Sequence, residues 1–224
     1  GIRRIASLRG LLQGEALSLP YYRSPRLADW VKRSVAEYGI TRAVAFSGPM
    51  AQYLGVPGLT RRVVDFCDVD SAKWTQYAAE HRWPMSWLYR REGERLLAFE
   101  REAAAQVDAS LFVTEAEAAL FCRAAPEATT RVGVMQNGVD ADFFSPANAG
   151  ESPYPPGGPV IVFSGAMDYW PNIDAVTWFA TELLPRIRQA VPGVRFCIVG
   201  MNPAPAVQAL AGEGVVVTGT VPDV

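Results

Sequence analysis

Residues 162–176 read VFSGAMDYWPNIDAV and combine three features of a phosphate-binding α/β unit. An apolar run from Val160 to Phe163, typical of a buried strand, is followed closely by Gly165. A short polar and aromatic loop follows, and apolar residues then recur at helical spacing from about Asn172. Strand, glycine turn and helix N-terminus form the arrangement by which open parallel sheets hold phosphate groups. The stretch therefore predicts an α/β fold with a parallel sheet.

The residues around this loop argue against two common nucleotide-binding motifs. A dinucleotide fingerprint needs Gly-x-Gly-x-x-Gly after the first strand and an acidic residue about 20 positions later. Only Gly165 is present, and the next strand ends in residues 198–202, IVGMN, without a carboxylate. A P-loop is excluded because the sequence contains no Gly-Lys pair. Two interpretations stay open: a looser anion site at Ser164 and Gly165, or an ordinary loop in which Asn172 caps the helix.

Composition excludes several classes of function. The chain has 224 residues, 50% of them hydrophobic, with a formal net charge of −2 and a pI of about 5.5, so bulk charge does not suggest a nucleic-acid partner. Its three cysteines form no Cys-x-x-Cys pair, and it has one histidine. This pattern argues against a disulfide framework or a zinc site and favours a reducing compartment. No apolar run approaches the length of about 18 residues that a membrane span needs.

Apolar periodicity predicts strand–helix alternation on both sides of a proline-rich segment. Residues 145–159 carry five prolines and three glycines, which is typical of a linker between domains. The part after it has only three predicted strands, so we expect a truncated domain whose edge strand at 215–218 could pair with a second copy. The predicted strands are 42–46, 62–66, 109–113, 131–135, 159–164, 194–199 and 215–218, and the predicted helices are 24–39, 84–107, 114–123, 172–191 and 204–211.

Five stretches together resemble one enzyme family. They are residues 7–22 (SLRGLLQGEALSLPYY), 63–78 (VVDFCDVDSAKWTQYA), 112–121 (FVTEAEAALF), 137–146 (NGVDADFFSP) and 162–188 (VFSGAMDYWPNIDAVTWFATELLPRIR). They are similar to retaining glycosyltransferases of the GT-B fold, family 4, above all to bacterial sugar transferases associated with exosortase (PEP-CTERM) and exopolysaccharide loci. The resemblance implies two Rossmann-like domains, a nucleotide diphosphate sugar as donor, no cofactor and no bound metal.

The resemblance also implies how the chain is organised. Residues 1–144 are similar to the C-terminal part of the acceptor-side domain, 145–159 to the hinge, and 160–224 to the first strands of the donor domain. Asn137 and Gly138 fall at the start of the hinge region. We expect both domains to be incomplete, because the family's glycine-rich acceptor loop and its Glu-x7-Glu segment are not present in this sequence.

Donor-binding residues are carried over from the family position by position. Gly165 matches the glycine beside the diphosphate, Gly200 the glycine near the nucleoside, and Thr220 and Val221 the positions whose backbone contacts the base. Each of these could equally be a turn residue. One departure is that loop 166–170 has no arginine or lysine, although many family members place such cations there. The predicted donor set is Ser164, Gly165, Asn172, Gly200, Met201, Asn202, Thr220 and Val221.

On the acceptor side the resemblance points to Asp68. Many relatives place a His or Asp at the end of the corresponding strand, where Cys67 and Asp68 stand here. Asp68 would orient the acceptor hydroxyl or assist its deprotonation, and the alternative is that it caps the following helix. In retaining enzymes of this type the donor phosphate itself is thought to accept the proton. His81 lies on a polar stretch and is expected to be structural.

Aromatic and basic residues between 74 and 95 leave two interpretations open. The aromatic residues could stack on sugar or lipid, but their helical spacing favours a core position. The arginines alternate with glutamates, which favours a solvated face over contact with a membrane surface. The aromatic residues are Trp74, Tyr77, Trp83, Trp87 and Tyr89, and the arginines are Arg82, Arg90, Arg91 and Arg95.

The residues and the resemblance together predict a cytoplasmic hexosyltransferase, with peripheral contact to the inner membrane as the minority alternative. Its donor would be a nucleotide diphosphate sugar and its acceptor an exopolysaccharide or another lipid-linked saccharide, with retention of configuration. We expect the chain alone to be inactive. The competing hypotheses are a non-catalytic nucleotide- or sugar-binding module and a GT-B-like epimerase or phosphorylase.

Overall fold

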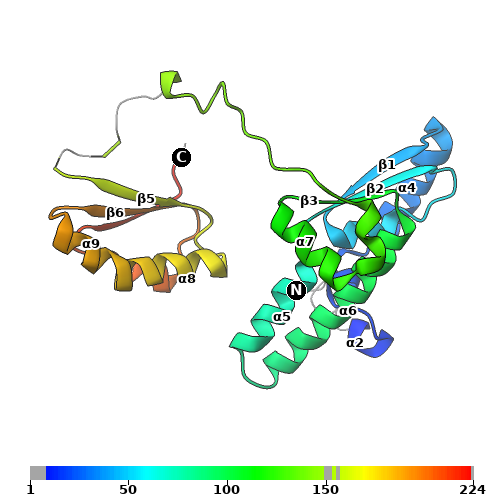
Figure 1. Cartoon of the computed structure of the whole chain (residues 1–224), viewed down its shortest axis with the longest axis horizontal. Helices are drawn as coiled ribbons and strands as arrows, with labels where there is room; N and C mark the ends of the chain where they lie inside the picture. The colour runs from blue at the N-terminus through cyan, green and yellow to red at the C-terminus, as the bar shows by residue number, and fades with distance from the viewer. Residues whose placement is uncertain (1–8, 149–152, 155–156, 223–224) are drawn as a thin grey trace. The chain divides into compact units, whose positions relative to one another are not determined.

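The chain divides into two compact units, Gly1–Asp140 and Ala141–Val224 (Figure 1). The computed structural model describes residues 9–148, 153–154 and 157–222. The division falls a few residues before the proline-rich segment at 145–159. Asn137 and Gly138 are exposed and lie in an irregular stretch just before the division. Their role as a hinge stays a prediction.

The first unit is built on a parallel sheet of four strands in the order β1-β2-β3-β4. Its core lies on β2 and β3, where the rings of Phe66 and Phe112 stack with centroids 5.5 Å apart and Phe121 packs against both. Burial of these apolar strands is what holds the sheet. The strands are β1 Arg42–Phe46, β2 Arg61–Cys67, β3 Ala109–Phe112 and β4 Val132–Val134.

Two helices of this unit begin where local sequence signals predict. The Ser24 hydroxyl accepts a hydrogen bond from the Leu27 amide, and Gly39 ends that helix with a φ of 59°. Thr114 accepts from the Glu117 amide at 3.1 Å. The helical elements are α2 Arg9–Gln13, α3 Ser18–Tyr22, α4 Pro25–Tyr38, η1 Gly48–Tyr53, α5 Asp70–Glu80, α6 Met85–Gln106, α7 Glu115–Ala124 and η2 Pro126–Arg131.

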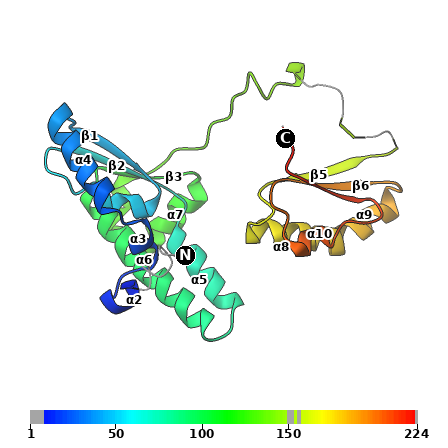
Figure 2. The same cartoon turned by 180° about the vertical axis from the view of Figure 1, so that it is seen from behind.

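In the second unit, a parallel sheet with the order β5-β6-β7 has its helices on one face (Figure 2). Phe196 and Ile198 point toward these helices and are buried, whereas Val162 and Val216 on the opposite face are each 46% exposed. Strand β7 lies at the sheet edge, and its pairing with a second copy stays a prediction. The elements are β5 Val160–Ser164, α8 Trp170–Trp178, α9 Leu184–Ala190, β6 Arg195–Val199, α10 Pro205–Gln208 and β7 Val215–Gly219.

The predicted helix over 172–191 is present, but it is not α-helical throughout. The helix begins at Trp170 and is interrupted by a π-helical turn over Phe179–Leu183. The Leu184 amide donates to the Phe179 carbonyl, and Pro185 has no N–H with which to continue the regular ladder. The proline therefore explains the change of helix type.

Helices α5 and α6 pack closely because α6 carries a glycine where the two meet. A Cβ atom at Gly93 would lie 2.6 Å from the Thr75 hydroxyl oxygen and 2.9 Å from the Ser71 carbonyl oxygen. Further along α6, Glu100 is 1% exposed and accepts hydrogen bonds from the Ser71 amide at 3.1 Å and the Ser71 hydroxyl at 2.5 Å. The buried carboxylate of Glu100 on α6 thus provides hydrogen-bond acceptors for the N-terminus of α5, where the first backbone amides have no partner within the helix.

Gly93→Ala should destabilise the first unit by roughly 1–3 kcal/mol, because the added methyl group meets the backbone of α5 and outweighs the gain in helix propensity. Gly55→Ala is the matched control, since a Cβ there has no heavy atom within 4 Å. Urea denaturation measures the unfolding midpoint and free energy of both variants. Equal midpoints for the two variants would contradict the account of the α5–α6 contact.

Glu100 should make stability depend on pH. Burial raises the pKa of Glu100 from 4.5 to about 7, against the hydrogen bonds from Ser71 that lower it. The folded state therefore binds this proton more tightly than the unfolded state. The protonated carboxyl of Glu100 contributes its full stabilisation of the folded state below pH 4.5, and this contribution is lost as the pH rises through 7. Relative to Glu100→Gln, the wild-type protein should lose up to about 3 kcal/mol across this window. A pH-independent difference between the two unfolding free energies would refute this.

Candidate functional site

A hollow of about 330 Å³ lies at the C-terminal ends of β5, β6 and β7. Ligands of open parallel α/β sheets bind at this edge, where the loops after the strands converge. Three separate loops contribute to the hollow, and six of the eight predicted donor residues line it. The lining residues are Ser164, Gly165, Ala166, Gly200, Met201, Thr220 and Val221.

The loops after β5 and β6 touch through their backbones at Gly200. This residue has a φ of 154°, and a Cβ atom on it would lie 1.6 Å from the Gly165 carbonyl oxygen. The Gly165 amide donates to the Val199 carbonyl at 3.0 Å, and the Gly200 amide donates to the Gly219 carbonyl at 3.2 Å. No side chain fits between the two loops, so position 200 requires glycine.

Asn172 contacts the loop after β5 through its side chain and does not line the hollow. Its side-chain amide donates to the Ala166 carbonyl at 3.0 Å, and a Cβ at Gly165 would lie 2.7 Å from that nitrogen. The helix begins earlier, at Trp170, and the Asn172 side chain does not cap it. The interpretation of Asn172 as the helix cap is therefore wrong. The backbone amides of Asn172 and Ile173 both donate to the Tyr169 carbonyl, so neither is free to bind a ligand.

Asn202 also lies outside the hollow and connects two loops. Its backbone has a φ of 53°, and its side-chain amide donates to an Asp168 carboxylate oxygen at 3.3 Å. The neighbouring Met201 is 53% exposed, and its carbonyl accepts from the Met167 amide at 2.9 Å. Sequence reasoning missed this link because the hydrogen bonds join residues more than thirty positions apart.

The lining of the hollow carries no charged side chain. Its polar groups are backbone atoms and the hydroxyls of Ser164 and Thr220. The absence of a cation in loop 166–170 is thus not compensated by an arginine or lysine from the other lining residues. Within the described part of the chain, no three His, Cys, Asp or Glu side chains are grouped so that they could hold a metal ion.

Asp68 lies at the end of β2 and is paired with a lysine. The Lys73 ammonium is 2.7 Å from an Asp68 carboxylate oxygen and 3.2 Å from one of Asp70. Burial lowers the pKa of Lys73, but its hydrogen bond to Asp68 and the charge of Asp70 outweigh this and raise the pKa. The cap of α5 is Val69, without a side-chain hydrogen bond, so the interpretation of Asp68 as a helix cap is wrong. The ion pair instead fixes the orientation of its carboxylate.

Two non-glycine residues with positive φ stand at the ends of adjacent strands. Ser47 follows β1 with a φ of 76°, and Cys67 ends β2 with a φ of 65°. The Ser47 amide donates to the Asp65 carbonyl at 2.8 Å, and the Cys67 amide donates to the Asp65 carboxylate at 3.1 Å. Such conformations are typical of positions that the surrounding structure constrains, often near functional sites. Burial, with the nearby charge of Asp65, raises the pKa of the Cys67 thiol, so it is not set up as a thiolate nucleophile.

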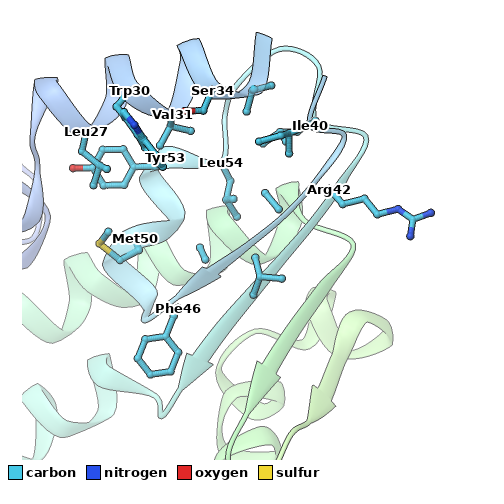
Figure 3. Close-up of a pocket in the computed structure, with 15 residues that line it drawn as sticks. Leu27, Trp30, Val31, Ser34, Ile40, Arg42, Phe46, Met50, Tyr53 and Leu54 are labelled. Atoms are coloured by element: carbon cyan, nitrogen blue, oxygen red, sulfur yellow. The ribbon is translucent and has the colours of Figure 1, made fainter. Parts of the chain in front are cut away.

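A larger hollow of about 440 Å³ lies between α4 and β1 (Figure 3). Its lining is almost entirely apolar, and Figure 3 shows Arg42 extending away from the other lining side chains. The Tyr53 hydroxyl, the only acidic group of the lining, donates to the Tyr22 carbonyl at 2.7 Å. The lining of this hollow contains no carboxylate, histidine, lysine or thiol that could serve in acid–base or nucleophilic chemistry.

No helix among the described residues combines the length and the apolar character that crossing a bilayer requires. His81 lies at the end of α5, where its Nδ1 is 2.9 Å from the Tyr77 carbonyl oxygen and its ring meets that of Tyr89 edge-on. These contacts agree with a structural role for His81.

Comparisons with known proteins bear on the second unit and on the fold. Residues 158–224 match the family model described as "Glycosyl transferases group 1". Among solved structures, the chain is similar to one described as "OtsA apo structure", with 14% sequence identity, a TM-score of 0.50 and coverage of 95% of this chain and 57% of that chain. No curated protein sequence matches the chain.

The chain thus spans little more than half the length of that structure, and at this identity the likeness establishes the fold alone. Both findings agree with the α/β, GT-B type of fold that the sequence predicted. The matched residues of the second unit, 158–224, include every residue that lines the hollow at the ends of β5, β6 and β7.

Proposed function

We propose that this protein is a glycosyltransferase whose donor, a nucleotide diphosphate sugar, binds in the hollow at the ends of β5, β6 and β7. One observation carries the proposal: the segment that matches the glycosyl transferases group 1 family, residues 158–224, contains all seven residues that line this hollow. The reaction is transfer of a hexose to an exopolysaccharide or another lipid-linked acceptor with retention of configuration. These finer features rest on the sequence resemblance.

The geometry of the hollow suits a diphosphate held by backbone atoms. The Cβ sides of Gly165 and Gly200 are filled by the Asn172 amide nitrogen and the Gly165 carbonyl oxygen, so these glycines let the two loops close on each other and place their backbone in the wall of the hollow. Thr220 and Val221 would offer their backbone to the base. Without a cation in the lining, the charge of the leaving diphosphate would be met by backbone dipoles and the N-terminal end of α8. No cofactor or metal is part of the proposed reaction.

On the acceptor side, Asp68 is proposed to orient the acceptor hydroxyl. Its ion pair with Lys73 at 2.7 Å restricts the rotation of the carboxylate, which favours a positioning role. In a retaining transfer the donor phosphate would take the proton, so Asp68 need not act as the base. The use of nucleotide sugars and the free cysteines support a reducing, cytoplasmic location.

One observation favours a second candidate, a non-catalytic nucleotide- or sugar-binding module. The hollow lacks the arginine or lysine that would stabilise the leaving diphosphate of a donor sugar. A binding module would hold the nucleotide and the intact donor sugar equally well and would release neither sugar nor nucleotide diphosphate. Release of nucleotide diphosphate on incubation with the donor would exclude the binding module.

Nucleotide binding to the 224-residue chain tests the proposed site. We expect UDP or GDP, but not NAD, to bind in calorimetric titrations without added metal. Gly200→Ala should weaken this binding at least about tenfold, because its Cβ forces the β5 and β6 loops apart. Gly212→Ala in the same unit is the matched control, since a Cβ there meets no heavy atom within 4 Å.

Circular dichroism of both glycine variants shows whether the second unit remains folded. If neither nucleoside diphosphate binds, or if folded Gly200→Ala binds as well as Gly212→Ala, the hollow is not the donor site.

A further inference from the structure

The turn that joins α5 to α6 forms an exposed tip on the first unit. Both views show this turn at the end of the helix pair that is farthest from β1, β2 and β3 (Figures 1 and 2). The tip comprises the last residue of α5, residues 81–84 and the first two turns of α6. We call residues 80–91 the α5–α6 tip.

Large apolar side chains of the α5–α6 tip point into solvent. Trp83 is 80% exposed, Trp87 is 55% exposed and Met85 is 38% exposed. The expectation that both tryptophans belong to the core is therefore wrong. Single exposed apolar residues are common on protein surfaces, but here three lie within five positions around one turn.

The tip is supported by a cluster of aromatic rings beneath it. Trp74 packs against Tyr77 with ring centroids 5.8 Å apart and against Tyr89 at 5.4 Å. The His81 ring lies 5.0 Å from that of Tyr89. These ring contacts join the end of α5 to the beginning of α6.

The α5–α6 tip is positively charged although the chain as a whole is negative. Residues 80–91 contain three arginines and one glutamate, against a formal net charge of −2 for the chain. Arg91 is engaged with the backbone carbonyls of Gly10 and Glu15, at 2.9 and 3.0 Å. Arg82 and Arg90 are exposed, and neither forms an ion pair within the described part of the chain.

Of the two acidic residues that follow the tip, Glu94 is exposed and Glu92 is not. Glu92 is 2% exposed and turns inward, where it accepts hydrogen bonds from the Ser18 amide at 2.9 Å and from the Ser18 hydroxyl at 2.7 Å. The buried carboxylate ties α6 to α3. The exposed surface of the tip therefore combines tryptophan with arginine.

We propose that the α5–α6 tip docks on the surface of an anionic lipid bilayer. Tryptophan favours the boundary between headgroups and acyl chains, where its ring is partly desolvated and its N–H can still donate. Arginine pairs with lipid phosphate, and the positive tip complements a negative surface. Trp83, Met85 and Trp87 enter the boundary, and Arg82 and Arg90 contact the headgroups. A protruding tip suits a bilayer better than it suits a partner that needs a broad complementary face.

This inference does not depend on the proposed function, because it is tested by binding alone. The wild-type chain is sedimented with phosphatidylcholine vesicles that either contain or lack phosphatidylglycerol. We expect binding to the anionic vesicles, at least about tenfold weaker binding without phosphatidylglycerol, and a strong decrease at high salt. Trp83→Ala/Trp87→Ala should lose binding at least about tenfold, and Arg82→Ala/Arg90→Ala should lose the preference for anionic lipid.

Matched controls come from the second unit. Trp178 is 55% exposed, like Trp87, and Arg186 is exposed, so Trp178→Ala and Arg186→Ala should bind vesicles as the wild type does. All changed residues are on the surface, and unchanged thermal unfolding verifies the fold. Absence of binding to anionic vesicles overturns the proposal, as does equal binding by the two tryptophan variants. A dimer in light scattering that Trp83→Ala/Trp87→Ala abolishes, without vesicle binding, would instead assign the tip to a second copy.

Discussion

The close approach of Gly200 to the Gly165 carbonyl is the constraint on which the candidate site depends. With room for no Cβ atom, the loops after β5 and β6 meet backbone to backbone, and the strand ends converge on one hollow. Side-chain amides of Asn172 and Asn202 then brace the loops from outside the hollow. A ligand held by such loops contacts main-chain atoms, so side-chain identity alone says little about it.

The first unit is organised differently, around carboxylates buried between helices. Glu100 accepts a hydrogen bond from the Ser71 amide at the start of α5, and Glu92 accepts one from the Ser18 amide at the start of α3. Both stand on α6, so this one helix fixes two others and carries the α5–α6 tip. Buried carboxylates need such complete sets of donors, because an unpaired charge in the interior is costly. The same helix thus connects the stability of the unit to the surface that it presents.

Sequence patterns predicted the features that depend on residues close in the sequence, such as helix caps, and missed the hydrogen bonds between residues far apart in the sequence. The caps at Ser24 and Thr114 and the stop at Gly39 follow from local hydrogen bonds and backbone angles. Glu117 stands at the capping-box position, yet its carboxylate accepts from the Val69 amide across the fold, which no local rule anticipates. The exposure of Trp83 was missed for a related reason: Trp83 lies between the two helices in the sequence, so helical spacing says nothing about its burial.

The site shows the same division. Six donor residues were predicted at the hollow through the family resemblance, while Ala166 and the bracing roles of Asn172 and Asn202 emerged only from the structure. Hydrogen–deuterium exchange of the chain with UDP or GDP tests the central claim most directly. The account predicts that the nucleotide protects amides in 164–167 and 199–203 and leaves β1 and α4 unchanged. Protection confined to the hollow between α4 and β1, or none at all, would contradict it.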